Sequence, residues 1–162
     1  RPEEIERVLG VGSGTARSGG SPAELPDSAS AVVEVAADLL GVMMVATDMK
    51  GQPLTGVANP PPWFSARAQD PASIADCVAE WKMLADEPDF EPRFHLGGLG
   101  FQCARAYIRS GTSLVGMVLA GGIAPPGSDA EDLYHLDPAQ LSRVLAALPK
   151  IAASLSRALP PQ

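Results

Sequence analysis

Cysteine, histidine and aromatic residues are scarce in this chain of 162 residues. It contains two Cys and two His, and only 5% of its residues are aromatic. Two cysteines can form at most one disulfide, which excludes a small scaffold held together by several disulfides. A closed zinc site needs four ligands, usually including a short pair such as C-x-x-C, and the sequence has no such pair. We therefore expect free thiols, no metal ion and no cofactor.

Basic residues and long apolar runs are also few. The chain has 12 Lys and Arg against 19 Asp and Glu, a net charge of −7. Nucleic-acid binding depends on clustered Lys and Arg, so we expect no direct nucleic-acid contact. No window approaches the roughly 18 apolar residues of a membrane span. Residues 1–10 lack the apolar core of a signal peptide, and a cytoplasmic location without membrane contact is expected. The chain starts at Arg1 rather than Met, which is compatible with a piece of a longer protein.

The remaining composition is that of one globular domain. Hydrophobic residues make up 46% of the chain, and its length is typical of a single core. Residues 1–27 read as a short helix followed by a flexible linker rich in Gly, Ser and Pro. The GVGSG in this linker lacks the Lys-Ser/Thr ending of a phosphate-binding loop. We expect residues 28–162 to form a single domain.

Residues 99–122 predict a β-hairpin around which the rest is organised. Two runs of β-formers flank Ser110-Gly111, a pair suited to a two-residue turn. This turn would place Arg105 opposite Gly116, with free space beside the arginine. Side chains alternate along a strand, so one face of the hairpin is mixed and the other apolar. Neither face looks solvent-exposed, and we expect layers on both sides of the sheet.

The other segments predict two more strands and several helices. Residues 42–47 and 54–58 read as a second hairpin, which would complete four antiparallel strands. Helices are expected at about 28–40, from 62 and from 71, the last capped by Asp70. In the first of these, Val32, Val35, Ala36, Leu39 and Leu40 would form the apolar stripe. A short acidic helix is expected within residues 124–136. The predicted fold class is α+β (α/β in the broad sense), a central antiparallel sheet flanked by helices.

A long helix is predicted from Asp137 to about residue 159. Its apolar stripe runs from Leu141 to Leu159 at helical spacing, with a kink expected at Pro149. A stripe of this length at a chain end often packs on a second copy as well as on its own sheet. We therefore expect a homodimer with the terminal helices at its interface.

The order of these segments resembles the PocR-type sensory domains of bacterial regulators, which have a PAS/GAF-like architecture. The resemblance covers residues 30–122. It rests on the turn DMKGQPLT at 48–55, the helix carrying Cys77, the pair Gly98-Leu99, and the G-x-x-x-x-G-G ending at 116–122. It implies a domain that binds a small organic molecule and relays its presence to an output domain in signal transduction or transcription regulation.

The sequence departs from this family at its cysteines. The region around Trp63 is rich in proline where the family has a cysteine. The family's Cys-His-x-Gly-Leu motif reads His95-Leu96-Gly97-Gly98-Leu99 here. If the family's cysteines serve a metal or redox function, this chain has lost it.

The candidate ligand-binding residues lie on the mixed face of the hairpin and on the helical insert before it. They are Phe101, Cys103, Arg105, Tyr107, Trp63, Cys77, Trp81 and His95. A buried arginine must be paired. Arg105 could therefore bind a carboxylate ligand with its bidentate fork. The simpler interpretation is an ion pair with Asp48, Asp76 or Glu80, or an exposed position at the edge of the sheet.

A Cys–His nucleophilic site is chemically possible, but nothing in the sequence brings the residues together. We therefore assign no catalytic residue and expect no enzyme activity. The predicted function is sensing of a small organic ligand between the sheet and the helical insert, relayed through the terminal helices. Two alternatives stay open: a dimerisation module without ligand, and a small Cys/His-dependent enzyme.

Overall fold

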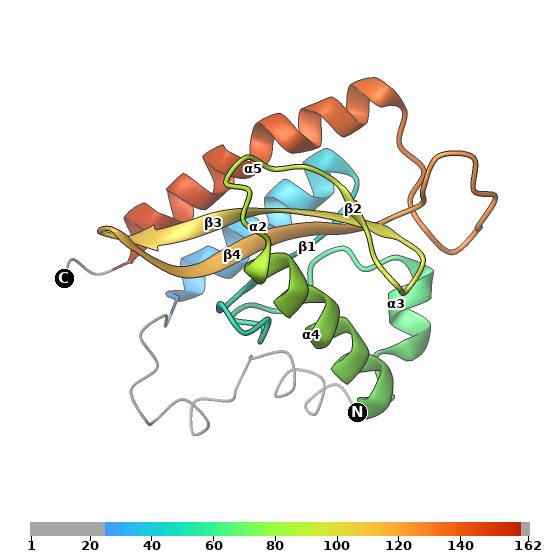
Figure 1. Ribbon diagram of the computed structural model, residues 1–162, viewed down its shortest axis with the longest axis horizontal. Coiled ribbons are helices and arrows are strands. Elements are labelled where there is room, and N and C mark those ends of the chain that lie inside the picture. Colours follow the sequence, from blue (N-terminus) through green and yellow to red (C-terminus); the bar gives the residue numbers. More distant parts are fainter. Residues whose placement is uncertain (1–24, 160–162) are drawn as a thin grey trace.

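A four-stranded antiparallel sheet lies at the centre of residues 25–159, the part of the chain that the computed structural model describes (Figure 1). Its strands are β1 (Met43–Thr47), β2 (His95–Leu96), β3 (Gln102–Ser110) and β4 (Ser113–Ile123), in the order β1-β4-β3-β2. The α+β class with a central antiparallel sheet is confirmed. The helix and linker predicted for residues 1–27 fall almost entirely outside the described residues.

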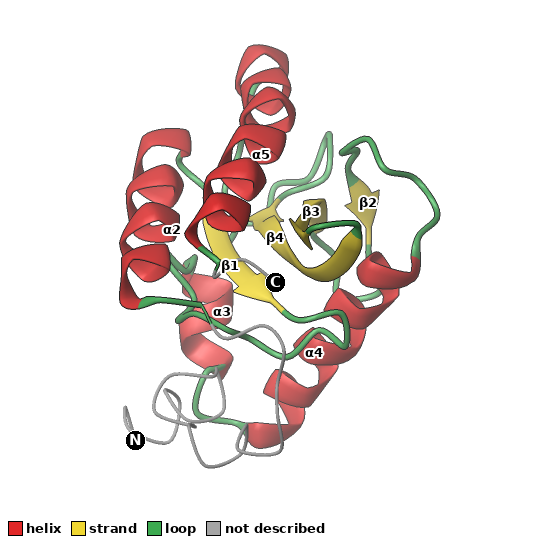
Figure 2. Cartoon of the chain, turned by 90° about the vertical axis from the view of Figure 1, so that its left-hand side faces the viewer, coloured by secondary structure: helices red, strands yellow, loops and turns green. Residues whose placement is uncertain are grey.

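Helices cover both faces of this sheet (Figure 2). One face carries α2 (Asp27–Leu40) and α5 (Pro138–Ala158), and the other carries α3 (Pro62–Arg67) and α4 (Pro71–Asp86). Three helix ends are formed by the residues that the sequence predicted: the C-terminal end of α2 and the N-terminal ends of α4 and α5. Gly41 ends α2 with φ 70°, the Asp70 side chain caps α4 through Ala72 N–H, and Asp137 caps α5.

Two apolar cores result, one on each side of the sheet. The first joins alternate sheet residues such as Ala106 and Ile108 to α2 and α5. The second joins the intervening residues, Cys103 among them, to α3 and α4. The expectation that both faces are covered is therefore confirmed, and the alternation follows from the two-residue period of a strand.

The register of the β3–β4 hairpin differs from the prediction. Ser110 pairs with Ser113, so the turn is Gly111-Thr112, and Arg105 faces Leu119 instead of Gly116. An irregularity between Ile108 and Arg109 shifts the register further. Gly116 has a different role: β4 crosses the end of β1 there, and a Cβ would overlap the carbonyl oxygen of Thr47. The space predicted beside Arg105 does not exist.

The fourth strand also differs from the prediction: it is β2, which pairs with β3 at the opposite edge from β1, and not residues 54–58. Residues 53–58 run beside β1 and pair with it irregularly. Isolated bridges join Met44 to Ala58 and Thr47 to Pro53, and the N–H groups of Leu54 and Thr55 both donate to Ala46 O. Proline has no N–H for a sheet, and the Thr55 hydroxyl oxygen accepts the Ala46 N–H at 3.1 Å in place of a main-chain partner. The segment follows the sheet without completing a strand.

The short acidic helix predicted within residues 124–136 is absent, and this described stretch is a loop. Tyr134 anchors it: its main chain bridges Ile123, and its hydroxyl donates to the Asn59 carbonyl at 2.8 Å. These long-range contacts outweigh the local preference of the acidic residues for a helix.

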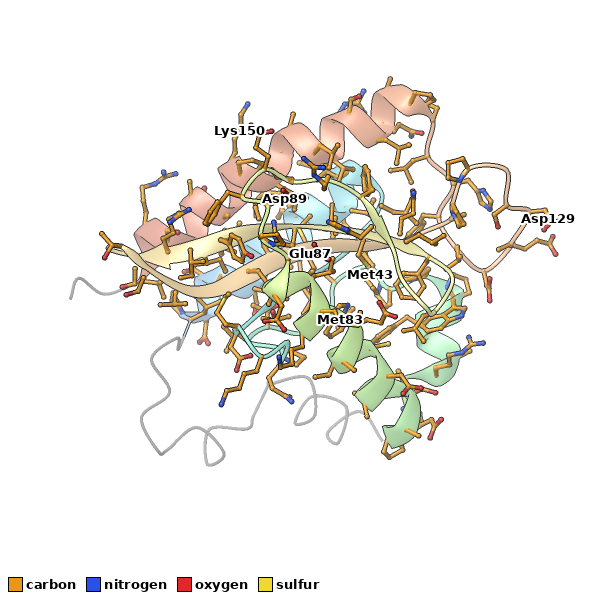
Figure 3. All side chains as sticks on the ribbon, in the orientation of Figure 1. Met43, Met83, Glu87, Asp89, Asp129 and Lys150 are labelled. Carbon is orange, nitrogen blue, oxygen red and sulfur yellow. The ribbon has the colours of Figure 1, made fainter. Side chains whose placement is uncertain are left out.

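The terminal helices differ in how well their buried faces were predicted. The buried residues of α5 are among those expected, whereas those of α2 are not. On α2 the buried residues are Ala29, Val33 and Ala37, so the predicted stripe is off by one position. Small side chains let this helix approach the sheet closely. On α5 the stripe from Val144 to Leu155 packs on the sheet, while Lys150 lies on the outer side (Figure 3). Among the described residues, no helix is both long enough and apolar enough to cross a membrane.

Candidate functional site

The predicted site residues all gather on the α4 side of the sheet. Trp63 comes from α3, Cys77 and Trp81 from α4, His95 from β2, and the others from β3 or the residue before it. Seven of them lie within or against the second core, or touch its residues directly, and the eighth, His95, pairs with Cys103 across the sheet. Alternation along β3 explains why Phe101, Cys103, Arg105 and Tyr107 share one face.

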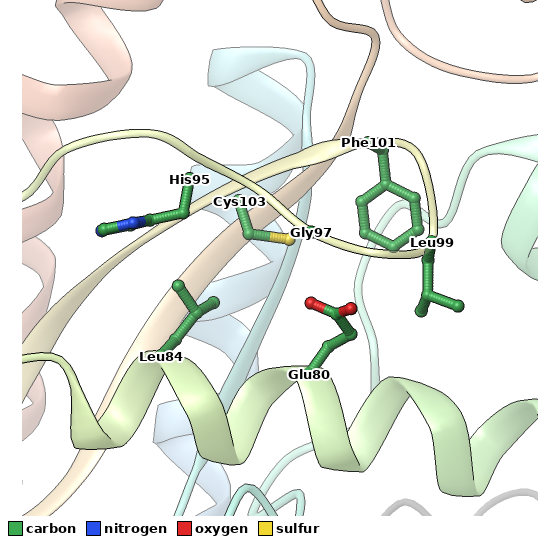
Figure 4. A pocket seen from close by; sticks show the side chains of 7 residues that line it. All are labelled: Glu80, Leu84, His95, Gly97, Leu99, Phe101 and Cys103. Carbon is green, nitrogen blue, oxygen red and sulfur yellow. The ribbon is translucent and has the colours of Figure 1, made fainter.

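A small cavity opens between α4 and the β2–β3 edge (Figure 4). Its lining consists of Glu80, Leu84, His95, Gly97, Leu99, Phe101 and Cys103. Its volume is about 20 Å³, enough for a water molecule. Pockets for organic ligands are larger, roughly 300 Å³ or more. An organic ligand could therefore enter only if the walls separate.

The wall formed by residues 97–100 is attached to α4 through Glu80. The Gly98 N–H donates to Glu80 Oε1 at 2.7 Å, and a Cβ at Gly97 would overlap the same carboxylate. Gly100 has φ 94°, and β2 is held to β3 by only two residue pairs. We call residues 97–100 together with Glu80 the Glu80 latch. It is a local contact beside a short edge strand.

Sequence reasoning missed this role of Glu80, which was considered only as an ion partner of Arg105. A signal was available. Glu80 lies three residues after Cys77 and four before Leu84, so it shares the face of α4 that turns toward the sheet. A carboxylate on an otherwise apolar helix face needs a partner, and the glycine-rich segment supplies an N–H.

Arg105 is only 2% exposed, and its guanidinium binds main-chain carbonyls. Its Nε donates to Leu84 O and its Nη2 to Glu87 O, both at 3.0 Å. The carbonyls at a helix C-terminus lack intrahelical partners and carry partial negative charge, which favours a cation there. The expected ion pair is wrong: within residues 25–159, no carboxylate pairs with Arg105.

Tyr107 completes this attachment of the C-terminal end of α4. Its hydroxyl lies 2.9 Å from Ala85 O and 2.8 Å from Glu87 O, and its single proton is shared between them. The Arg105 guanidinium stacks over the Tyr107 ring at 4.1 Å. Phe90 packs edge-on with the same ring, and their centroids lie 5.7 Å apart. Arg105 and Tyr107 therefore hold residues 84–87 on the sheet.

The two cysteines are buried and unreactive at neutral pH. Burial raises the pKa of Cys77 to about 11 and that of Cys103 to about 12. Both are free, and at neutral pH they are protonated thiols, which are poor nucleophiles and poor metal ligands. Among residues 25–159, no three or more His, Cys, Asp or Glu side chains are grouped to hold a metal ion.

The aromatic residues divide into core and rim. Trp81 is 1% exposed, belongs to the second core and does not line the cavity. Trp63 is partly buried; it packs edge-on against Phe101 at 4.9 Å and carries Arg67 over its ring at 4.3 Å. Phe101 lines the cavity, so the Trp63–Phe101 pair joins α3 to its wall.

The G-x-x-x-x-G-G ending of β4 has a steric explanation in this site. A Cβ at Gly121 would lie 2.8 Å from Cys103 Sγ, and one at Gly122 would lie 2.8 Å from the Pro61 ring. Gly122 also has φ 71°, which favours glycine. These glycines therefore let Cys103 point across β4 and let α3 begin close to the sheet.

Comparison with known proteins assigns no family. No family model and no curated protein matches the chain. The solved structures that match include three at low identity and low TM-score. A targeted domain of an IclR-family transcriptional regulator has a TM-score of 0.48 and 13% identity, covering 83% of this chain and 96% of that one. MglB of Myxococcus xanthus has a TM-score of 0.43 and 13% identity, covering 80% and 98%.

The third structure is HmgR of Pseudomonas aeruginosa, with a TM-score of 0.40 and 15% identity, covering 90% of this chain and 74% of that one. At these scores the likenesses carry no argument about what this chain binds or does. The resemblance of the sequence to PocR-type domains stays a prediction.

Proposed function

We propose that the chain is a small-molecule-sensing domain of a bacterial signal-transduction or transcription-regulatory protein. The ligand binds between α4 and the β2–β3 edge, at the cavity closed by the Glu80 latch. One observation carries this proposal: a cavity on a sheet face where every predicted site residue gathers, closed by a single hydrogen bond on a glycine-rich edge.

The cavity lining favours a particular ligand chemistry. The Glu80 carboxylate accepts hydrogen bonds, and Leu84, Leu99 and Phe101 supply apolar contacts. Arg105 is engaged by α4 and does not line the cavity. The site therefore suits a small amphiphilic molecule carrying hydroxyl or amine donors, and it disfavours a carboxylate.

Binding and signalling follow from the same contact. A ligand that takes the place of Gly98 N–H at Glu80 separates residues 97–100 from α4 and enlarges the cavity. It stabilises the open form because it binds that form better than the closed one. Arg105 and Tyr107 keep the end of α4 on β3, and β3 contacts α5 through the Arg109 N–H donated to Ser156 Oγ at 3.0 Å. The terminal helices α2 and α5 relay the change.

A thermal-shift screen of the whole chain tests this proposal, using small diols, amines, carboxylic acids and aromatic compounds. We expect a donor-bearing compound to raise Tm. At a concentration 100 times its Kd, it should stabilise the folded chain by about 2.7 kcal/mol. The informative variant is Glu80→Gln, which keeps an oxygen for Gly98 N–H but removes the charge. Its ligand-induced shift should be smaller.

The matched control is Asp86→Asn, which removes a carboxylate from the same helix at an exposed position paired with Lys82. It should keep the full ligand-induced shift. The proposal is wrong if no compound class raises Tm and native mass spectrometry finds no retained small molecule. A shift of equal size in wild type and Glu80→Gln would remove the assigned binding site.

A dimerisation module without ligand remains the second candidate. The cavity has room only for a water molecule, and both Arg105 Nε and Arg105 Nη2 donate to main-chain carbonyls. Both observations favour a filled interior in the closed form. The same screen separates the two candidates, because a module of this kind gives no ligand-induced shift.

A further inference from the structure

The two terminal helices form one layer with opposite charges. Figures 1 and 2 show α2 and α5 side by side on the same face of the sheet. The charged residues of α2 are all acidic and those of α5 all basic. They are Asp27, Glu34 and Asp38 on α2, and Arg143, Lys150 and Arg157 on α5, all exposed.

The spacings of these charges match. Asp27 and Glu34 are seven residues apart, as are Arg143 and Lys150, and Lys150 and Arg157. Seven residues of α-helix rise about 10.5 Å. Two such helices laid along each other would therefore bring acidic and basic side chains together at more than one point.

An apolar row accompanies the acidic residues of α2. Val32, Val35 and Leu39 are 37%, 58% and 79% exposed, although they are large hydrophobic side chains. They lie away from the buried face marked by Val33. On α5 the exposed positions Ala139, Ala146 and Ala153 repeat at seven-residue intervals beside the basic row. Small side chains permit close approach of a second helix, and the apolar row supplies what that helix needs to bury.

These features are not satisfied within one described chain. Across residues 25–159, no ion pair joins α2 to α5, although the helices are neighbours. The apolar stripe of α5 that suggested a dimer from the sequence is buried on its own sheet. A two-fold axis makes this arrangement self-complementary, because a second copy offers α5 to α2 and α2 to α5 at once.

We propose that the outer faces of α2 and α5 form a homodimer interface, in which α2 of each copy packs on α5 of the other. Val32, Val35 and Leu39 pack against the alanine positions of α5, with the acidic row opposite the basic row. Glu34 and Lys150 stand near the middle of their helices, so they meet whichever way the helices run. This interface is on the opposite face of the sheet from the cavity, and the argument for it does not rest on the proposed ligand site.

Sedimentation velocity and light scattering of the full chain test the proposal. We expect a dimer at low ionic strength whose Kd rises with salt, because exposed charges are screened. Leu39→Glu should raise Kd by at least roughly tenfold, since the change acts at two symmetric contacts. The matched control is Met83→Glu on α4, 66% exposed on the other side of the molecule, which should leave Kd unchanged. Circular dichroism checks that both variants fold.

A charge exchange identifies the partner surface. Glu34→Lys and Lys150→Glu should each weaken the dimer, and the double variant should recover it, because α2 and α5 of different copies then attract again. A wild type that stays monomeric overturns the proposal. The occupant of the outer face of α2 would then be residues 1–24 or another protein, and not a second copy. A dimer that tolerates Leu39→Glu, or a double variant no tighter than the single ones, also overturns the α2–α5 pairing.

Discussion

Replacing Arg105 with methionine tests whether this buried arginine attaches α4 to the sheet. Methionine has a similar length and no charge, so it keeps the apolar packing but removes both hydrogen bonds to Leu84 O and Glu87 O. If the arginine were instead held in reserve for a carboxylate ligand, its removal from a buried site would leave stability unchanged or raise it.

The expected loss follows from the contacts. Each hydrogen bond from a charged donor contributes about 1.5–3 kcal/mol, and the stacking over Tyr107 contributes about 0.5–2 kcal/mol. The desolvation penalty of the buried charge offsets part of this sum. We expect a net loss of about 3 kcal/mol. Lysine cannot reach both carbonyls with a single ammonium group, so Arg105→Lys should lose about half as much.

Urea unfolding followed by circular dichroism measures these differences in the free energy of unfolding. In thermal unfolding, Tm should fall by about 9 °C for Arg105→Met, at about 3 °C per kcal/mol for a chain of this size. The control is Arg109→Met on the same strand, which is exposed and whose guanidinium contacts Phe90 only at 5.5 Å. It should change stability by less than about 0.5 kcal/mol. An Arg105→Met variant as stable as the Arg109→Met control would refute the reasoning.

Two further predictions concern packing and ionisation. Gly116→Ala should destabilise the domain by about 2–3 kcal/mol in the same assay, because its Cβ overlaps the main-chain oxygen of Thr47; an unchanged midpoint would mean that β4 can move away from β1. The thiols should make stability fall as pH rises above 9.0, their ordinary pKa, since the unfolded chain then releases protons that Cys77 and Cys103 keep up to pKa values of about 11 and 12. Unfolding midpoints measured from pH 8 upward should fall more steeply for wild type than for a Cys77→Ala/Cys103→Ala double variant, and equal slopes would contradict the burial effect.

Local signals in the sequence were enough to predict most of the helices. Asp70 and Asp137 each precede a proline at the start of a helix, and Gly41 ends one, because capping and positive φ depend on neighbouring residues alone. Alternation also predicted which β3 residues share a face. The sensing function and its ligand remain proposals, because chemistry in a sequence does not show which side chains are free to bind.

Pairing between distant segments could not be predicted in the same way. The sequence around Ser110-Gly111 allows more than one turn, and the close approach of β4 to β1 at Gly116 selects the observed register. Similarly, residues 54–58 have the composition of a strand, but Pro53 and the Thr55 hydroxyl interrupt their main-chain pairing with β1, and the fourth strand is β2 at the opposite edge. The register decides which residues of β4 lie opposite the site residues of β3, and it places Leu119 instead of Gly116 opposite Arg105.

Arg105 illustrates the division. The sequence by itself determined that an arginine stands mid-strand on the same face as Cys103 and Tyr107, and that a charge there must find a partner. Only the tertiary structure decided that the partners are the carbonyls ending α4, because their position depends on how a helix from another part of the chain packs on the sheet. The same packing placed Glu80 against Gly98 and left the row of α2 from Val32 to Leu39 exposed. Residue chemistry is local, whereas the distance between two segments is set by the whole fold.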